Sequence, residues 1–430
     1  MRVAYITAGA AGMYCGSCMH DNTLVTALRP LGVDVALIPT YTPIRTDEED
    51  VSMHRVFFGG INVFLQQKFS LFRHTPWLLD KLFDNRRLLK WVSRFSSSTD
   101  ARELGALTVS VLAGEEGNQK KELMKLVAWL EESFKPDLVL IPNSMFVGFA
   151  RSIKDRLGVP VLCALQGEDL FLDAMIEPYR ERAFGLLKTR AADVDGFLAN
   201  STYYRELMGS YLAVDTEKIH LVPLGLNLDD HGKSEPDHHG DPFTIGYLAR
   251  ICPEKGLHLL VRAFKLLTDR IGREGVRLKI AGYLSPKDQA YADDLKSKIR
   301  GWGLESQVDF GGEVDRQEKI RFLAGLHVFS VPAPYKEPKG IYLLEALANG
   351  IPVVQPRHGA FTALVEDTGG GLLVEPHSPE ALADGLSRLY QDRALCRAMG
   401  EAGKRSVHER HSSQTMAEKT LEVFKKFATA

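Results

Sequence analysis

The sequence lacks several features that would each define a class of protein. No stretch reaches about 18 uninterrupted apolar residues, so we expect no membrane-spanning helix. The first residues do not combine a basic segment with a long apolar one, so we expect no signal peptide. The 5 cysteines are scattered and odd in number, which indicates a reducing compartment rather than a disulfide framework. We therefore expect a cytoplasmic protein, and a peripheral position on the inner face of the membrane stays open.

An excess of charge of one sign is also missing. The formal net charge is -2, so no global field attracts nucleic acid, and we expect no nucleic-acid partner. The chain has 430 residues, of which 45% are hydrophobic and 25% charged. These values are typical of a globular protein with two to three domains.

What the sequence does contain is an alternation of short β-rich runs with amphipathic stretches, and this alternation occurs twice. We predict strands near residues 3–7, 33–39, 137–142, 160–165 and 196–200, and again near 243–248, 276–281, 307–310, 327–331 and 352–355. Helices are expected near residues 23–31, 144–157, 175–192, 257–271 and 413–427. The pattern predicts an α/β fold with two Rossmann-like, doubly wound parallel sheets. Two such domains imply a cleft between them, and ligands bind beyond the carboxyl ends of the strands.

The predicted domains are residues 1–225, with an insertion near 54–130, and residues 243–405. Between them, residues 226–242 are polar and contain glycine and proline, which is typical of a linker. This stretch contains His231, His238 and His239, but their spacing matches no metal-ligand pattern. We interpret it as a solvated hinge rather than a metal site.

The segment GYLARICPEKG, residues 246–256, combines a strand end, a loop and a helix start. The loop carries Arg250 and Lys255 beside the helix N-terminus, where unpaired N–H groups add positive charge. Arginine binds phosphate in a bidentate way and lysine acts as a compact charge, so a diphosphate would fit. A pair of solvated surface charges is the alternative.

The segment EPKGIYLLEALANGIP, residues 337–352, contains a second helix start. Glu337 precedes the helix and Glu345 lies about one turn inside it, while Gly340 and Ile341 offer backbone N–H groups at its start. Carboxylates would repel a phosphate, but they accept hydrogen bonds from the hydroxyls of a sugar or ribose. The alternatives are an exposed helix glutamate for Glu345 and a charge that favours a helix N-terminus for Glu337.

The pair Glu337 and Glu345, separated by seven residues, resembles the E-x7-E signature of GT-B glycosyltransferases of family four. Arg250 and Lys255 are similar to the upstream Arg–Lys pair of that family, and residues 307–314 resemble its nucleobase segment. The resemblance covers most of residues 243–390. It implies that residues 406–430 form a helix that crosses back to the N-terminal domain. The sequence departs from the family at Lys339, where an aromatic residue is common.

The resemblance also implies roles for these residues in binding a nucleotide-sugar donor. Arg250 and Lys255 would bind the diphosphate, and the N–H groups of Gly340 and Ile341 would assist. Glu345 would hydrogen-bond the ribose. Glu337 would hold hydroxyls of the transferred sugar.

The loop after the first predicted strand contains Cys15-Gly-Ser-Cys18 and His20. It does not fit the G-x-G-x-x-G fingerprint, which excludes a nicotinamide site. The loop resembles the Gly-Gly turn of the family, with Gly16 in the second position and Cys15 in the first. Gly16 would then approach the donor, and Cys15 and His20 are acceptor-side candidates. The cysteines also form a C-x-x-C pair, and we favour a packed pair over a redox or zinc site.

Gln166 follows the strand predicted at 160–165, where family members commonly have a histidine beside the reacting carbon. Glutamine can hydrogen-bond a sugar hydroxyl but cannot take a proton. The resemblance implies that Gln166 and Glu337 are the catalytic pair, and that the departing phosphate accepts the proton. Glu168 and Asp169 are acceptor-side candidates, and helix capping is the alternative for both.

Residues 54–95 are rich in aromatic and basic side chains. They would dock on an anionic membrane or bind a lipid-linked or polyanionic acceptor. A folded subdomain with an aromatic core is the alternative, which we favour.

The resemblance therefore implies a retaining, metal-independent transfer of a hexose-type sugar from a UDP-, GDP- or ADP-sugar, with no cofactor. The acceptor is a glycan, a lipid-linked molecule or a small molecule. A sugar-phosphate synthase or phosphorylase, or a catalytically silent glycan-binding module, are the alternatives.

Overall fold

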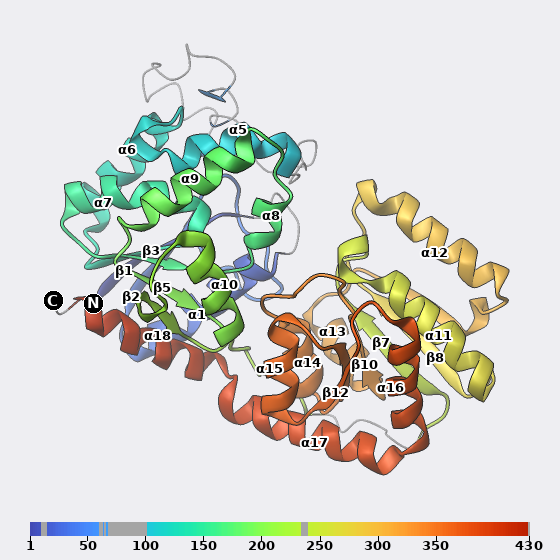
Figure 1. The fold of residues 1–430 in the computed structure, drawn as a ribbon. Helices are drawn as coiled ribbons and strands as arrows, with labels where there is room; N and C mark the ends of the chain where they lie inside the picture. Colours follow the sequence, from blue (N-terminus) through green and yellow to red (C-terminus); the bar gives the residue numbers. More distant parts are fainter. Residues whose placement is uncertain (10–14, 60–62, 64–65, 68–100, 234–239, 429–430) are drawn as a thin grey trace. The chain divides into compact units, whose positions relative to one another are not determined.

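The computed structural model describes residues 1–430 except 10–14, 60–62, 64–65, 68–100, 234–239 and 429–430. The chain divides into two compact units, Met1–Gly225 with Ser413–Ala430, and Leu226–Ser412. Each unit is built on a six-stranded sheet in which all paired strands are parallel (Figure 1). The α/β class and the two doubly wound sheets predicted from the sequence are confirmed.

The first unit has the strand order β2-β1-β3-β4-β5-β6. Its strands are β1 (Arg2–Thr7), β2 (Asp34–Pro39), β3 (Leu138–Ile141), β4 (Val161–Ala164), β5 (Gly196–Ala199) and β6 (Ile219–Leu221). Its helices are α1 (Gly16–Leu28), α5 (Ala101–Leu112), α6 (Lys120–Trp129), α7 (Ala150–Leu157), α8 (Asp169–Asp173), α9 (Tyr179–Ala191), α10 (Thr202–Leu212) and α18 (Ser413–Ala428). Shorter helical turns are η1 (Arg29–Leu31), η3 (Gly114–Glu116), η4 (Leu130–Phe134), η5 (Ser144–Phe149) and η6 (Thr216–Lys218).

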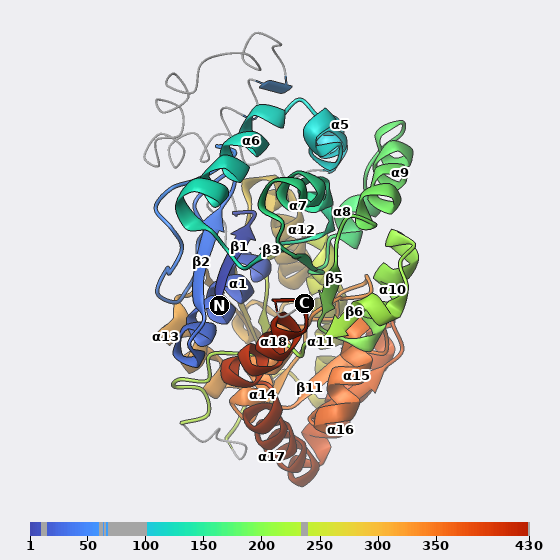
Figure 2. The same cartoon turned by 90° about the vertical axis from the view of Figure 1, so that its left-hand side faces the viewer.

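Both faces of the first sheet are buried, as is usual for a parallel sheet. Successive side chains of a strand point to opposite faces, so neighbouring residues belong to different clusters. In β1, Val3 and Tyr5 belong to one hydrophobic cluster, and Ala4 and Ile6 belong to the other. The first cluster includes residues of α1 and α18, which pack against each other (Figure 1 and Figure 2). The last helix of the chain is therefore part of the core of the first unit.

The second unit has the strand order β12-β11-β10-β7-β8-β9. Its strands are β7 (Phe243–Leu248), β8 (Val276–Ala281), β9 (Val308–Gly312), β10 (Val328–Phe329), β11 (Val353–Pro356) and β12 (Gly371–Val374). Its helices are α11 (Leu257–Ile271), α12 (Gln289–Gly301), α13 (Arg316–Ala324), α14 (Ile341–Ala348), α15 (Gly359–Thr368), α16 (Pro379–Gln391) and α17 (Arg393–Arg410). Its shorter turns are η7 (Pro253–Lys255), η8 (Pro286–Asp288) and η9 (Glu305–Gln307).

Strand order identifies the place in each sheet where a ligand would bind. The chain moves outward in one direction from β1 and then in the other from β3, and it does the same at β7 and β10. Loops that leave neighbouring strands in opposite directions open a crevice at the carboxyl ends of those strands. The residues that follow β1, β3, β7 and β10 are therefore the candidates for ligand contacts.

The segment 226–242, which we expected to be a linker, is counted with the second unit. His231 is buried, and its Nδ1 lies 2.8 Å from Nδ2 of Asn349, at the end of α14. Lys404 of α17 donates to the carbonyl of Gly232 over 2.7 Å. His231 is thus a packed residue and not part of a solvated hinge, whereas His238 and His239 lie outside the described residues. The expected boundary at 406 also differs, because α17 runs to Arg410.

Candidate functional site

The loops that follow β7 and β10 meet at an ion pair between Lys255, which is partly buried, and Glu337, which is buried. Lys255 Nζ lies 2.6 Å from Glu337 Oε2 and 2.6 Å from the hydroxyl of Tyr335. Both charged side chains come from the carboxyl-end loops of the two strands at which the sheet order reverses. The ion pair therefore lies where this fold binds ligands.

A single oxygen of Glu337 receives three hydrogen bonds. Its Oε2 accepts from Lys255, from the hydroxyl of Tyr335 at 2.5 Å and from the hydroxyl of Tyr342 at 2.8 Å. Burial alone would raise the pKa of Glu337, but Lys255 and the two tyrosines outweigh it and lower the pKa to about 2. Among the described residues, none donates to the other oxygen, Oε1. Glu337 is thus a fixed, ionised carboxylate with one oxygen available as an acceptor.

Lys255 contacts two tyrosines. Its Nζ lies 5.0 Å from the ring centre of Tyr342, within the range of cation–π attraction, and it contacts Tyr335 through the hydroxyl. The ammonium donates to Tyr335 and Glu337. Its third proton has no hydrogen-bond partner in the part of the chain that the structure describes. Lys255 can therefore orient Glu337 and still offer one N–H to an anion.

Two glycines bring the loops of this site together. Gly256 has a φ of 71°, and a Cβ there would lie 2.0 Å from the carbonyl oxygen of Pro332. A Cβ on Gly359 would lie 2.6 Å from the carbonyl oxygen of Glu337, which accepts a hydrogen bond from Ala360 N at 2.8 Å. Side chains at these positions would push the loops apart, so glycine is required by close approach.

The remaining predicted donor residues lie on the same two chain segments of the second unit as this pair. Arg250 is exposed, and its carbonyl accepts a hydrogen bond from the Tyr247 hydroxyl at 2.9 Å. Gly340 precedes α14 with a φ of 75°, and Ile341 is the first residue of that helix. The N-terminal turn of α14 thus follows closely after Glu337, and helix N-termini favour anions.

Glu345 is part of a second lysine–carboxylate pair. Its Oε1 lies 2.5 Å from Nζ of Lys319, which belongs to α13. Both residues are more than nine-tenths buried, with exposures of 8% and 7%. Among the described residues, none donates to the other oxygen of Glu345. Both glutamates of the signature therefore have one oxygen fixed by a lysine and one without a described donor.

In the first unit, Gln166 joins a buried hydrogen-bond network at the carboxyl ends of the strands. Its Nε2 donates to Asp21 Oδ1 at 2.7 Å and to the carbonyl of Pro142 at 3.0 Å. Asp21 also accepts from the hydroxyls of Tyr5 at 2.5 Å and Thr7 at 2.7 Å. The amide nitrogen of Gln166 is thus bound to protein groups.

His20 lies at the edge of the same network. Its Nδ1 is 3.4 Å from Asp21 Oδ1, and its side chain is partly exposed. Gly16 is the first residue of α1, and Cys15 precedes it without a side-chain capping bond. Of the side chains named in this network, that of His20 is therefore the one with access to solvent.

The C-x-x-C pair consists of two free thiols. Cys18 is buried, and its hydrogen bond to Cys15 together with this burial raises its pKa well above the usual range. A protonated thiol is a poor nucleophile. This environment supports the interpretation of a packed pair over a redox site.

Glu168 and Asp169 share one tyrosine. Glu168 accepts from the backbone N–H groups of Ser144 at 2.8 Å and Gln166 at 2.7 Å, and from the Tyr204 hydroxyl at 3.1 Å. The same hydroxyl lies 2.9 Å from Asp169 Oδ1. A hydroxyl has one proton to donate, so it cannot satisfy both carboxylates. Glu168 therefore supports the loop rather than facing a ligand.

Replacing Asp169 with asparagine should stabilise the protein at neutral pH. Burial raises the pKa of Asp169 from 3.8 to about 6, so the ionised form is costly in the folded state. The wild-type free energy of unfolding should increase as the pH falls from about 6 to about 4, because Asp169 takes up a proton in the folded state over this range. Asp169→Asn should lack that gain and be more stable by roughly 1–3 kcal/mol at pH 7. Urea unfolding at pH 7 and pH 4 measures the difference.

The control for this prediction is Asp155→Asn, which changes an exposed aspartate of α7. It should change stability by less than about 0.5 kcal/mol at either pH. Equal stability of Asp169→Asn and wild type at pH 7 would contradict the prediction.

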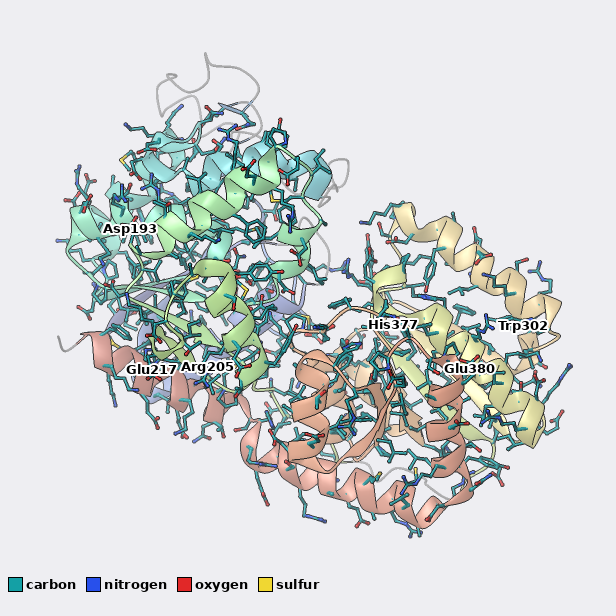
Figure 3. All side chains as sticks on the ribbon, viewed as in Figure 1. Asp193, Arg205, Glu217, Trp302, His377 and Glu380 are labelled. Atoms are coloured by element: carbon teal, nitrogen blue, oxygen red, sulfur yellow. The ribbon has the colours of Figure 1, made fainter. Side chains whose placement is uncertain are left out.

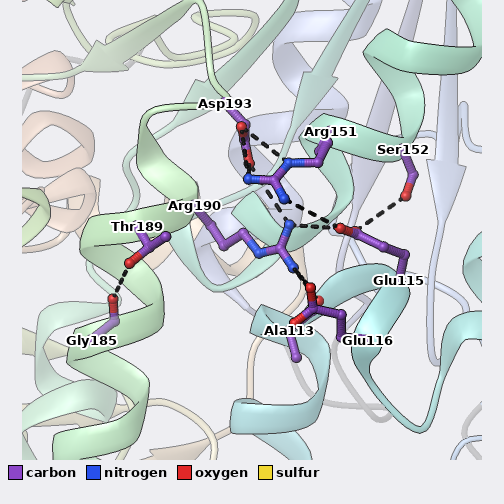
Figure 4. Close-up of polar contacts among 9 residues, drawn as sticks. All are labelled: Ala113, Glu115, Glu116, Arg151, Ser152, Gly185, Thr189, Arg190 and Asp193. Carbon is purple, nitrogen blue, oxygen red and sulfur yellow. Dashed lines mark hydrogen bonds and ion pairs between the residues drawn. The ribbon is translucent and has the colours of Figure 1, made fainter.

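An Asp-x-Asp triplet occurs at Asp193-Val194-Asp195, between α9 and β5, and its spacing is that of a metal motif. Its first residue, Asp193, is labelled in Figure 3. Asp193 forms ion pairs with Arg151 and with Arg190 (Figure 4). Asp195 accepts from Lys154 at 2.6 Å and from the backbone of Val161 at 2.8 Å. The triplet lies at the amino ends of the strands and ties helices to the sheet, so it does not belong to the site.

The aromatic and basic stretch 54–95 lies largely outside the described residues, since the structure leaves out 68–100. Phe57 and Phe58 are buried in the core of the first unit. In the part of the chain that is described, no helix has the length and apolar character needed to cross a bilayer.

Sequence reasoning named Lys255, Glu337 and Glu345 as candidates but did not predict the side chains that contact them. The two glutamates accept hydrogen bonds from Lys319, Tyr335 and Tyr342. In the first unit, Asp21 accepts from Gln166, and Tyr204 donates to Asp169. Tyr335 and Tyr342 flank Glu337 in sequence, so aromatic residues near the glutamate were a usable signal. Lys319 precedes Glu345 by 26 residues, and no local spacing connects them.

Two family models match the chain. The model described as "Glycosyl transferases group 1" matches residues 231–406, and the model described as "Glycosyltransferase Family 4" matches residues 107–230. The two matched segments adjoin and together include each of Gln166, Arg250, Lys255, Glu337 and Glu345.

Curated relatives match over parts of their length. A GDP-mannose-dependent alpha-(1-6)-phosphatidylinositol monomannoside mannosyltransferase of Mycobacterium tuberculosis is 31% identical over 186 residues, 42% of this chain and 46% of that protein. A D-inositol 3-phosphate glycosyltransferase of Kineococcus radiotolerans is 30% identical over 251 residues, 54% of this chain and 57% of that protein. The matches thus span about half the length of these relatives.

Solved structures share the fold over the whole chain. Anabaena HepE in complex with UDP superposes with a TM-score of 0.70 at 17% identity, covering 99% of this chain and 100% of that one. A sucrose-phosphate synthase from Thermosynechococcus elongatus gives a TM-score of 0.72 at 17% identity, with both chains covered to 100%. At this identity the likeness establishes the architecture alone.

Proposed function

We propose that this chain, which belongs to the family-four glycosyltransferases of the GT-B fold, transfers a sugar from a nucleoside diphosphate donor to an acceptor. The observation that carries the proposal is the pair of buried glutamates, Glu337 and Glu345. Each has one oxygen held by a lysine, at 2.6 and 2.5 Å, and one without a described donor. Fixed carboxylates of this kind suit the neutral hydroxyls of a sugar and a ribose.

The donor diphosphate would be bound by positive groups around the same loop. Arg250, the third proton of Lys255 and the backbone N–H groups of Gly340 and Ile341 are the candidates. As the bond between the sugar and the phosphate breaks, negative charge grows on the departing phosphate. Preorganised donors stabilise that charge without reorganising during the reaction.

The acceptor-side candidates belong to the first unit. Gln166 serves as a support for Asp21, because its amide nitrogen donates to that carboxylate. Gly16 offers a backbone N–H at the start of α1, and Cys15 and His20 remain acceptor-side candidates. Glu168 and Asp169 would hold the loop in place rather than contact the acceptor.

We further propose that the reaction retains the anomeric configuration, needs no metal ion and transfers a hexose. The cationic and helix-terminal groups of the donor loop support metal independence, since they supply the charge that a metal ion would otherwise provide. The Asp193–Asp195 triplet is occupied by cations and backbone groups, which also supports it. The mannosyltransferase relative uses GDP-mannose and HepE binds UDP, which supports a nucleoside diphosphate hexose.

A nucleotide screen tests the proposal directly. UDP, GDP, ADP and their hexose conjugates should be scanned by thermal shift, with and without EDTA. At a concentration of 100 times its Kd, the correct nucleotide should stabilise the protein by about 2.7 kcal/mol. The shift and the rate of sugar transfer should both be unchanged by EDTA.

The alternatives give different outcomes. A silent module would bind a nucleotide sugar without releasing the nucleotide when acceptors are supplied. A phosphorylase would release a sugar phosphate when inorganic phosphate is the acceptor. No stabilisation by any nucleotide would overturn the donor site, and a product of inverted anomeric configuration would overturn the retaining mechanism.

A further inference from the structure

The buried pair between Lys319 and Glu345 contains a lysine to which the proposed function gives no role. Lys319 lies on α13 and Glu345 on α14, and Nζ and Oε1 are 2.5 Å apart. Both residues are more than nine-tenths buried. A carboxylate at such a depth is costly unless a cation and hydrogen bonds offset its desolvation.

The position of Lys319 is fixed from the start of its helix. Asp315 and Glu318 form a reciprocal capping box, in which Glu318 N donates to Asp315 at 2.8 Å and Asp315 N donates to Glu318 at 2.9 Å. Arg316 donates to the carbonyls of Asn227 and Asp229, each at 3.0 Å. The first turn of α13, where Lys319 lies, therefore has little freedom to move.

Glu345 is fixed from the opposite end of its helix. Asn349 Nδ2 donates to the carbonyl of Glu345 at 2.8 Å, and Asn349 Oδ1 accepts from Gly232 N at 3.0 Å. Backbone contacts thus hold α14, while Lys319 holds the carboxylate itself. Without the lysine, the side chain of Glu345 would have no described group to select its orientation.

We propose that Lys319 is a positioning residue for the donor ribose and that it acts through Glu345. This inference rests on the proposed function, in which Glu345 accepts hydrogen bonds from the ribose. Lys319 occupies Oε1 and directs Oε2 toward the ribose hydroxyls. A fixed acceptor loses less conformational freedom when the ribose binds than a free one would.

The test compares the affinities of UDP and 2′,3′-dideoxy-UDP, or of the corresponding GDP pair if the screen selects GDP. The wild type should prefer the nucleotide with ribose hydroxyls by roughly tenfold or more. Lys319→Met should reduce this preference to about threefold or less, because a carboxylate that is not held in place binds the hydroxyls more weakly. The affinity for the dideoxy nucleotide should stay within about twofold, because that nucleotide makes no bond to Glu345.

Two further variants serve as controls. One keeps the positive charge at position 319, and the other removes an exposed positive charge elsewhere on α13. Lys319→Arg keeps a cation and should retain most of the preference. Arg321→Met changes an exposed cation of the same helix and should leave both affinities unchanged. If Lys319→Met does not fold, Lys319→Gln takes its place. Its uncharged amide holds the carboxylate of Glu345 more weakly than the ammonium does, so this variant should lose part of the preference.

The outcomes separate the inference from the proposed function. A preference that is unchanged in Lys319→Met and Lys319→Gln overturns the inference, and so does an equal loss of affinity for both nucleotides. A wild type that binds both nucleotides equally also overturns it, but leaves nucleotide binding intact. A wild type that binds neither nucleotide contradicts the proposed function itself.

Discussion

Lys255→Met should cause the largest combined loss of stability and activity in this chain. The substitution leaves Glu337 ionised and buried with only the hydroxyls of Tyr335 and Tyr342 as donors. Removing one partner of a buried ion pair typically costs about 3–5 kcal/mol. The same change removes a cation from the proposed phosphate site, so sugar transfer should fall by a factor of about 100 or more. Urea unfolding and a nucleotide-release assay measure the two effects.

The double variant Lys255→Met/Glu337→Gln separates these effects. It removes the unpaired charge, so most of the lost stability should return, while transfer should remain as low as in the single variant. Lys265→Met is a matched control, because Lys265 pairs with Asp269 on the same helix near the surface. That control should cost less than about 1 kcal/mol. A double variant as unstable as Lys255→Met would show that the charge imbalance is not the cause.

Gly256→Ala should disrupt the same site through the backbone. The added Cβ would lie 2.0 Å from the carbonyl oxygen of Pro332, three residues before Tyr335, and the φ of 71° disfavours alanine. Relief of this clash requires the two loops to separate. We expect a loss of about 3–5 kcal/mol in the free energy of unfolding. A displacement of about 1 Å at Glu337 should also lower transfer by a factor of about 100.

Gly369→Ala distinguishes the clash from the backbone conformation. Gly369 also has a positive φ, 63°, but a Cβ there would meet its nearest neighbour at an ordinary 3.8 Å. Its variant should lose only about 1–2 kcal/mol, and it should transfer sugar normally. Similar losses in the two variants would mean that the contact with Pro332 has no special effect.

Sequence patterns predicted the strands of this fold well because parallel strands covered on both faces are continuous apolar runs. Each of the ten predicted runs corresponds to a strand, and the two that were missed, β6 and β12, lie at the sheet edges. β6 has 3 residues, and the residues of β12 are only half-buried. Short and partly exposed edge strands lack the apolar signal on which the prediction depends.

The candidate site was predictable where its residues follow one another along the chain. Glu337, Gly340 and Glu345 lie within one short segment, so their spacing carries information. The partners Lys319 and Tyr204 come from other helices, and only the folded chain brings them to Glu345 and to Asp169. Gln166 shows the same limit, because its hydrogen bond to Asp21 joins residues 145 positions apart.

The place of α18 in the first unit has a consequence for the synthesis of this protein. Met416, Ala417, Val423 and Phe424 of this helix fill the same hydrophobic cluster as Val3 and Tyr5 of β1. A chain that is still growing on the ribosome can close the core of the second unit first, because Leu226–Ser412 is continuous. The first unit, although it is made earlier, must wait until α18 emerges, and until then α1 covers only part of this apolar face. The N-terminal unit should therefore be the one that needs a chaperone during translation.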